Sequence, residues 1–331
     1  MTTVGAAVSQ LPLSPRIGRM ILLACLLGCG PAAVTTAACM GYRDPFVMPM
    51  NDGQRAQCNQ AKARLGGEQV HSDQVVAQRA LDAFTHVLKR SGMSQARRFC
   101  EDNFLSLTTM TFIEEVVTQL NHIMRDVNVL PSQARAMRNN GNAALLQAVV
   151  SAGLYPDVGV RREGAIIFTT ERACKAKIHG ASVNARVPTY RKKCVKPAEI
   201  VGFQNLVASA EASASVATYI GGANLVMLGT TPLSVFTLLL SCGRLEEIST
   251  GEENEELKSE QHVEVEADGW FSLQMHRDHF VMLTHARHLL STALVSFLRS
   301  PLKPLDAAVG KGIEKLAEVM AHEQQNCTSF R

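Results

Sequence analysis

The chain is poor in aromatic residues, which make up 5% of its 331 positions and include one tryptophan. Stacking of many nucleobases on aromatic side chains is therefore not a prominent theme. The charge is nearly balanced, with 33 Lys and Arg against 30 Asp and Glu, a formal net charge of +3. This total does not by itself indicate a nucleic-acid binder, although a local basic patch fits within it. The 46% hydrophobic content is typical of a globular chain, and the length predicts two or three domains.

The sequence also lacks any pair of cysteines in the CxxC spacing, and its nine cysteines are an odd number scattered along the chain. A disulfide framework or a zinc ribbon would require paired or clustered spacing. Free and mostly buried thiols are the simplest interpretation, which predicts an intracellular, reducing compartment. Nucleus, cytoplasm and mitochondrion are equally compatible with this.

No apolar run is long enough to cross a membrane near the N-terminus, because Gly28, Gly30 and Pro31 interrupt the run at 20–27 well before about 20 residues. Arg16 and Arg19 precede this run and Cys29 follows it, so the segment imitates a lipoprotein signal. The favoured alternative is a buried helix that begins near a proline and ends before a glycine–proline pair. We therefore expect no membrane association, with an exported lipoprotein as the competing hypothesis.

Helical periodicity dominates the first half of the chain. A helix pair is expected over 15–40, and apolar residues recur with a 3.6 period from Ser72 or Asp73, the expected N-cap, to Gly92. A further long helix is expected over 110–128, beginning at Ser106 or Thr108. Residues 51–70 are polar and are expected to be mobile. Residues 15–150 are thus predicted to form an α-helical bundle.

The pattern changes between residues 150 and 184. Apolar residues begin to alternate with polar ones, as in half-buried strands. Cationic side chains are interleaved with them and would share one face of the sheet, which is the pattern of a phosphate-backbone binder. The competing interpretation is an ordinary solvated barrel surface. These cationic residues are Arg161, Arg162, Arg172, Lys175, Lys177 and His179.

A mixture of helices and strands is expected after residue 231. A short buried helix is expected within 232–242, and the acidic stretch 246–266 is expected to be a solvated loop or hairpin tip. A turn at 268–270 leads into a last strand, a closing helix covers 278–298, and 306–322 could form one more helix. The fold class is therefore α+β: a helical bundle, then an OB-type barrel with a closing C-terminal helix.

Four histidines near the start of this closing helix suggest a metal site, because pairs three residues apart share a helical face. No carboxylate or thiolate obviously converges on them, so surface histidines are the favoured interpretation and no metal is expected. The four are His276, His279, His285 and His288.

The order of these segments resembles the C-terminal accessory region of DExH-box (DEAH/RHA-type) RNA helicases, nearly to residue 297. Residues 3–13 are similar to the end of the family's winged helix, and 15–22, 27–29 and 37–46 to the start of its ratchet domain. HSDQ at 71–74 stands where the family has Ser-Asp-His, and RFCEDNFLS at 98–106 resembles its ratchet helix pair. AGLYPDV at 152–158 and IHGASVN at 178–184 resemble the opening of its OB-fold, and 231–233 and 268–270 its end.

The resemblance implies four segments: a winged-helix remnant at 1–14, a ratchet bundle at 15–150, an OB-fold at 151–300 and a helical or disordered tail at 301–331. It also implies a role in RNA processing, in which the module grips single-stranded RNA through phosphate and sugar contacts. Gly180 and Ala181 replace the family's usual Pro and Ser, which removes one hydroxyl donor. The RNA-binding candidates are Arg161, Arg162, Lys177, His179, Ser182, Asn184 and, on the ratchet side, Arg98.

The chain contains neither a G-x-x-x-x-G-K-[ST] phosphate loop nor an Asp-Glu-x-His run. It is therefore not expected to be an enzyme on its own, and no cofactor is expected in it. ATP and magnesium would bind the RecA-like motor domains that the family places upstream. A truncated or split gene is favoured over a motor-less paralogue. The alternative function is protein interaction, in which the chain docks a helicase or ribonucleoprotein without binding RNA itself.

Overall fold

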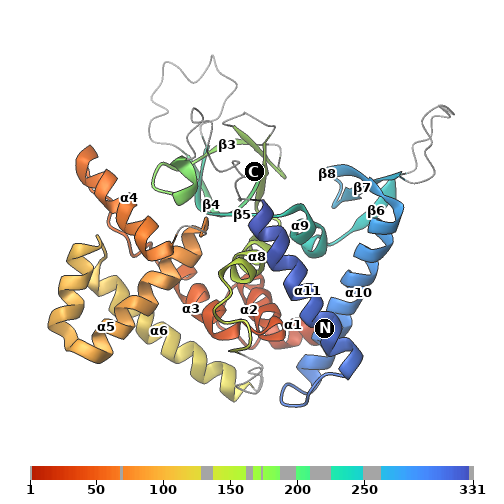
Figure 1. The fold of residues 1–331 in the computed structure, drawn as a ribbon, viewed down its shortest axis with the longest axis horizontal. Helices are drawn as coiled ribbons and strands as arrows, with labels where there is room; N and C mark the ends of the chain where they lie inside the picture. Colours follow the sequence, from red (N-terminus) through yellow and green to blue (C-terminus); the bar gives the residue numbers. More distant parts are fainter. Residues whose placement is uncertain are drawn as a thin grey trace.

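Helices form the lower layer of the molecule and a small barrel lies above them (Figure 1). The structure, a computed structural model, describes residues 2–67, 70–127, 137–161, 167–172, 174–186, 199–208, 225–248 and 262–327. The helices of the first half are α1 Thr3–Val8, α2 Pro15–Leu27, α3 Gly30–Met40, α4 Asp52–Gly66, α5 Asp73–Asp102, α6 Leu107–Asp126 and α8 Ala143–Leu154.

The central helices α2 and α8 are almost entirely buried. Helix α2 begins with Pro15 at its first turn and ends at Gly28, whose φ of 84° suits glycine. The apolar run at 20–27 is therefore a core helix, as the favoured interpretation expected. Helix α8 packs against it so closely that a Cβ on Gly153 would lie 2.7 Å from the Met20 side chain.

Local capping sets the starts of two long helices. The Ser72 hydroxyl accepts the Val75 N–H at the start of α5, and the Ser106 hydroxyl accepts the Thr109 N–H at the start of α6. Gly92, with a φ of 77°, introduces a kink within α5 where the sequence predicted a helix end. Of the two candidates expected at the start of each helix, Ser72 and Ser106 are the N-caps.

The expectation of a mobile segment over 51–70 is wrong, because α4 fills most of it. Asn51 caps this helix by accepting the N–H of Gly53 at 2.8 Å. Cys58, Ala61 and Lys62 are buried on one side of α4, which packs against α5. The buried stripe is narrow and includes a lysine, so the polar composition concealed it.

A closed barrel of five strands follows α8, in the order β1-β2-β3-β5-β4. All of its neighbouring strands are antiparallel except β3 and β5, which are parallel. A small core of Phe168, Ala176, Val201, Phe203 and Met227 fills it. The strands are β1 Val158–Val160, β2 Phe168–Thr170, β3 Lys175–Ile178, β4 Ile200–Ala208 and β5 Leu225–Pro232, and the 3-10 helix η1 Val183–Arg186 follows β3.

A separate three-stranded sheet, in the order β6-β7-β8, lies beside the barrel. Its strands are β6 Leu245–Ile248, β7 His262–Ala267 and β8 Phe271–His276, so both ends of the acidic stretch lie in a hairpin whose tip is outside the described residues. The region 151–300 thus contains more than the barrel. Its helices are α9 Val235–Ser241, the short buried helix expected there, and α10 Arg277–Arg299.

The last helix, α11 Ala307–Asn326, is part of the main core. It packs on α8 and α2 and buries Ile313, Leu316 and Met320. At its C-terminal end the Gln324 amide donates to the Pro232 carbonyl at 2.7 Å, which fastens α11 to the end of β5. The observed order of helical bundle, closed barrel and C-terminal helix confirms the α+β prediction.

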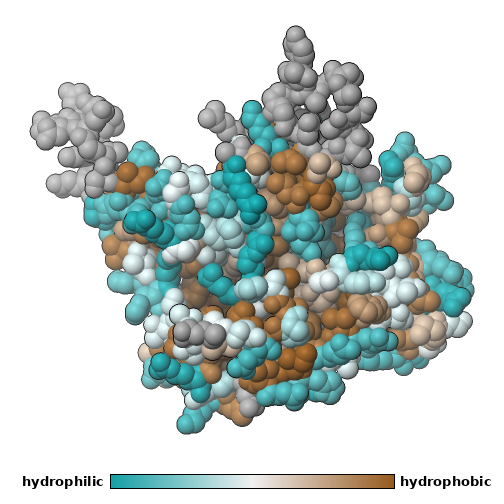
Figure 2. All heavy atoms as spheres, turned by 180° about the vertical axis from the view of Figure 1, so that it is seen from behind, coloured by the Kyte–Doolittle hydropathy of each residue, from teal (hydrophilic) through white to brown (hydrophobic). Residues whose placement is uncertain are grey.

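The surface seen from behind is largely hydrophilic, with apolar areas in its lower half, where the helical layer lies (Figure 2). Among the described helices, only α10 is long and apolar enough to cross a membrane, by criteria of length and composition that core helices and signal sequences also meet. Its Leu283, Ala293, Leu294 and Phe297 are buried in the main core.

Candidate functional site

A hollow of about 230 Å³ lies between the helical layer and the barrel. Tyr42 and Arg43, just after α3, line it from the helical side together with Lys62 of α4. Asp73 of α5 and His179, just after β3, complete its wall. The hollow is therefore assembled from segments that are far apart in the sequence.

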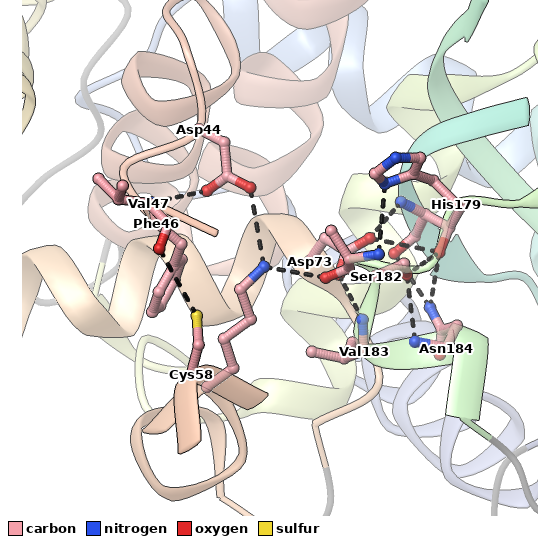
Figure 3. Close-up of polar contacts among 12 residues, drawn as sticks. Asp44, Phe46, Val47, Cys58, Asp73, His179, Ser182, Val183 and Asn184 are labelled. Atoms are coloured by element: carbon pink, nitrogen blue, oxygen red, sulfur yellow. Dashed lines mark hydrogen bonds and ion pairs between the residues drawn. The ribbon is translucent and has the colours of Figure 1, made fainter. Parts of the chain in front are cut away.

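Asp73 joins the two layers below this hollow (Figure 3). Its carboxylate accepts the N–H of Val183 in η1 and the N–H of Thr230 in β5, each at 2.8 Å. Burial raises the pKa of this carboxyl group, against the opposing effects of the Lys62 charge and of hydrogen bonds to the ionised form. The carboxylate thus offsets the cost of its own burial by satisfying barrel N–H groups.

Lys62 is 4% exposed, which is unusual for lysine. Its ammonium donates to the Ala181 carbonyl at 2.9 Å and lies 3.8 Å from Asp44 Oδ2. It also lies 4.8 Å from the centre of the Phe46 ring, within the range of a cation–π contact. Lys62 therefore ties α4 to the loop after α3 and to the loop after β3.

Ser182 and Asn184, two of the predicted RNA-binding residues, hold the loop after β3 in place (Figure 3). The Ser182 and Thr230 hydroxyls lie 2.8 Å apart, and the Asn184 amide donates to the carbonyls of His71 at 3.0 Å and Thr230 at 3.1 Å. The side chain of Ser182 is buried. Both polar groups are thus engaged within the chain, and their contact with RNA stays a prediction.

Lys177 and His179 are exposed and alternate with Ala176 and Ile178, which face the barrel core. They share one face, because successive side chains of a strand point to opposite sides. The His179 Nδ1 accepts the Ala181 N–H at 3.2 Å. In its neutral form the ring must therefore carry its proton on Nε2, which is left as a donor.

Arg161 lies on the same part of the barrel. Its guanidinium is 5.0 Å from the centre of the Phe168 ring, and Phe168 pairs in register with Ala176, the neighbour of Lys177. Partial burial lowers the pKa of Arg161, and the nearby Glu199 carboxylate opposes that change. The structure thus places Arg161 beside Phe168 of β2, which packs in the barrel core.

Arg162 and Arg98 are the remaining predicted residues. Arg162 lies outside the described residues. Arg98 is exposed on α5 beyond the kink at Gly92. Their proposed roles stay predictions.

Sequence reasoning missed Lys62, Asp44 and Tyr42. Lys62 lies in the polar stretch that was expected to be mobile, and Tyr42 and Asp44 entered the sequence analysis only within residues 37–46, which resemble the start of the ratchet domain. The one available signal was the Tyr-Arg-Asp-Pro-Phe sequence, in which the Asp44 side chain accepts the Phe46 N–H at 2.9 Å.

The histidines of the last sheet and helix lie near one another only in pairs within the described part of the chain. Within the described residues, no group of three or more His, Cys, Asp and Glu side chains could hold a metal ion. The His276 ring lies 5.5 Å from that of His262 and 5.7 Å from that of His279, measured between ring centres. His285 and His288 are exposed on α10.

The cysteines that the structure describes are free thiols, and most of them are buried. Burial raises the pKa of Cys25 and of Cys29 to about 12, and that of Cys100 to about 11. Such thiols remain protonated near neutral pH and react slowly. Cys174, at the start of β3, is half-buried.

Comparisons with known proteins agree with this architecture. Residues 14–79 match the helicase-associated domain (HA2), ratchet-like. The chain is 32% identical over 191 residues to DExH-box ATP-dependent RNA helicase DExH1 of Arabidopsis thaliana, which covers 56% of this chain and 19% of that protein. It is 28% identical over 208 residues to ATP-dependent RNA helicase dhx29 of Xenopus laevis, covering 57% and 15%.

A third relative is ATP-dependent DNA/RNA helicase DHX36 of Rattus norvegicus, 28% identical over 195 residues, with 56% of this chain and 19% of that protein covered. The matched region thus spans less than a fifth of each of these three relatives. The resemblance to the C-terminal accessory region of DExH-box RNA helicases is confirmed.

Proposed function

We propose that the chain is a single-stranded RNA-binding accessory module of a DExH-type RNA helicase. The observation that carries the proposal is the pair Lys177 and His179, exposed on one face of β3 beside the hollow between barrel and helices. The five-stranded barrel, closed in the order β1-β2-β3-β5-β4, is in our interpretation an OB-fold, a fold that often binds single strands.

The chemistry of this face suits a phosphate backbone. The Lys177 ammonium and the Nε2–H of His179 are exposed donors, and the guanidinium of Arg161 belongs to the same barrel. Contacts of this kind bind phosphates and release condensed counterions, and they carry little sequence information. We therefore expect binding that weakens with salt and depends little on sequence.

The module would act together with RecA-like domains that bind ATP and magnesium. Those domains belong to the helicase relatives by resemblance, and they are the proposed protein partners, with other ribonucleoprotein components as further candidates. We place this activity in an intracellular, reducing compartment, because the described cysteines are free and largely buried.

A binding experiment with two variants tests this proposal. Replacing Lys177→Ala and His179→Ala together should weaken binding of a fluorescein-labelled single-stranded RNA, measured by fluorescence anisotropy. It should also reduce the slope of log K against log salt by roughly 0.7 for each phosphate that the variant no longer neutralises. Lys311→Ala, at an exposed position near the start of α11, is the matched control. Unchanged affinity and slope in the double variant would overturn this placement of the site.

Exposed apolar side chains favour a second candidate function, docking of a protein partner. Val281 is 46% exposed and Met282 is 59% exposed on α10, away from the barrel hollow. If the chain binds no RNA, this face is the first place to substitute. Val281→Ser with Met282→Ser should then abolish co-purification with a RecA-like helicase partner, and retained co-purification would contradict this candidate.

A further inference from the structure

Tyr42, Arg43 and Phe112 form an exposed stack, of which Tyr42 and Arg43 line the helical side of the hollow. The ring centres of Tyr42 and Phe112 lie 4.4 Å apart, and the Arg43 guanidinium lies 5.4 Å from the centre of the Tyr42 ring. Tyr42 is 38% exposed and Phe112 is 43% exposed, and Arg43 is exposed as well. Large aromatic side chains that could pack inward are here held at the surface.

Arg43 is not needed as an ion-pair partner within the described part of the chain. Its neighbour Asp44 is engaged elsewhere, since one carboxylate oxygen accepts the Phe46 N–H and the other faces Lys62 at 3.8 Å. Within the part of the chain that the structure describes, the planar guanidinium rests on an aromatic ring and forms no ion pair. A planar cation over a ring is a surface on which another flat π system stacks.

The loop that carries Tyr42 and Arg43 is fastened by backbone hydrogen bonds to the segment before α6, the helix that carries Phe112. Ser106 N–H donates to the Pro45 carbonyl at 2.9 Å, and Val47 N–H donates to the Phe104 carbonyl at 2.8 Å. Phe46 is buried beneath the Lys62 ammonium. A preformed surface loses little conformational entropy when it binds a ligand.

Tyr42 and Arg43 of the stack line the hollow from the helical side, and the exposed His179 lines it from the barrel side. Its volume of about 230 Å³ is below the roughly 300–1,000 Å³ of sites for drug-sized ligands, so it suits one flat ring and not several. His179 and Lys177 would then contact a phosphate while a flat group enters beside Arg43.

We propose that the Arg43–Tyr42–Phe112 stack is a platform for one nucleobase of the bound single strand. This inference rests on the proposed RNA binding and deepens it, because it assigns a base contact to a surface otherwise expected to contact only phosphate and sugar. The contact tolerates any sequence, since every base has a flat π face.

The test compares two ligands of equal length, an oligouridylate and an abasic ribose-phosphate oligomer, on the full chain at one salt concentration. Arg43→Lys keeps the positive charge but replaces the planar guanidinium with an ammonium group that cannot stack. The wild type should bind oligouridylate at least about 5-fold more tightly than the abasic oligomer. This factor corresponds to the weakest stacking of a base on an aromatic side chain that is usually found. Arg43→Lys should abolish this difference and leave abasic affinity unchanged. Arg299→Lys, exposed at the end of α10, is the control.

The outcomes separate the two claims. If the wild type binds both ligands equally, or if Arg43→Lys binds oligouridylate as the wild type does, the platform is overturned while backbone binding stands. If the wild type binds neither ligand at low salt, the proposed function fails and the platform fails with it. Because Arg43 is exposed, an unchanged thermal unfolding midpoint in Arg43→Lys verifies that the fold is intact.

Discussion

Asp73 and Thr230 are 157 positions apart in the sequence, and the Thr230 N–H donates to Asp73 Oδ2 at 2.8 Å. One partner begins α5 and the other lies in β5, so the bond joins the helical layer to the barrel. The Val183 N–H meets the other carboxylate oxygen at the same distance. The position of the loop after β3, and so of His179, depends on this carboxylate.

Asp73→Asn should therefore destabilise the protein. The amide has one acceptor where the carboxylate has two, so a barrel N–H would face an N–H₂ group and lose its partner. The expected loss is about 2 kcal/mol in the free energy of unfolding, measured with urea. Asp52→Asn, whose side chain is 96% exposed, should change stability by less than about 0.5 kcal/mol. Equal stability of Asp73→Asn and the wild type would contradict the proposed link.

His71 should make stability depend on pH. Burial lowers the pKa of this imidazole below its ordinary value of 6.5, so the unfolded state binds its proton more readily. The contribution is then fully present above pH 6.5 and is lost as pH falls through the lowered folded-state value. Between pH 8 and 5, His71→Gln should lose less stability than the wild type. His285→Gln, on the exposed face of α10, should lose as much stability as the wild type. If the unfolding free energies of the wild type and His71→Gln changed with pH in parallel, the proposed contribution of His71 would be contradicted.

Tyr155 should stabilise the contact between the end of α8 and the turn that joins β7 to β8. Its hydroxyl donates to Asp268, which also accepts the Gly243 N–H at 2.9 Å. Burial and this hydrogen bond both raise the pKa of Tyr155. Tyr155→Phe should cost about 1–2 kcal/mol of unfolding free energy, because an ionised acceptor loses a donor. Tyr42→Phe is the matched control. If the two changes lowered the unfolding free energy equally, the proposed stabilisation by the Tyr155–Asp268 hydrogen bond would be contradicted.

Thiol reactivity should differ sharply along the chain. Cys25 and Cys29 are fully buried with pKa values raised to about 12, so the reactive thiolate is scarce at pH 8. Native alkylation followed by mass spectrometry should modify the half-buried Cys174 well before either of them. Denatured protein provides the control, in which all three should react at similar rates. Early labelling of Cys25 would show that the helical core opens readily.

Features set by neighbouring residues could be predicted from the sequence. Ser72 and Ser106 begin helices through hydrogen bonds within one turn, and Gly28 ends α2 in a conformation that suits glycine. The alternation around β3 also predicted which side chains are exposed. These signals are local, so no tertiary contact was needed to recognise them.

Long-range contacts account for what was not predicted. Lys62 is buried because three groups from two distant loops surround its ammonium, and nothing near it in the sequence indicates this. Tyr42 meets Phe112 only after α3 and α6 have packed. Strand β7 alternates between exposed and buried residues much as β3 does, and the pairing partners show that the two strands belong to different sheets.

The central claim is tested most directly by fluorescence anisotropy of the wild-type chain with a short fluorescein-labelled single-stranded RNA across a salt series. We predict micromolar or tighter binding at low salt that weakens steeply as salt rises, because phosphate contacts release counterions. A folded sample that binds no RNA at low salt would contradict the proposed RNA binding.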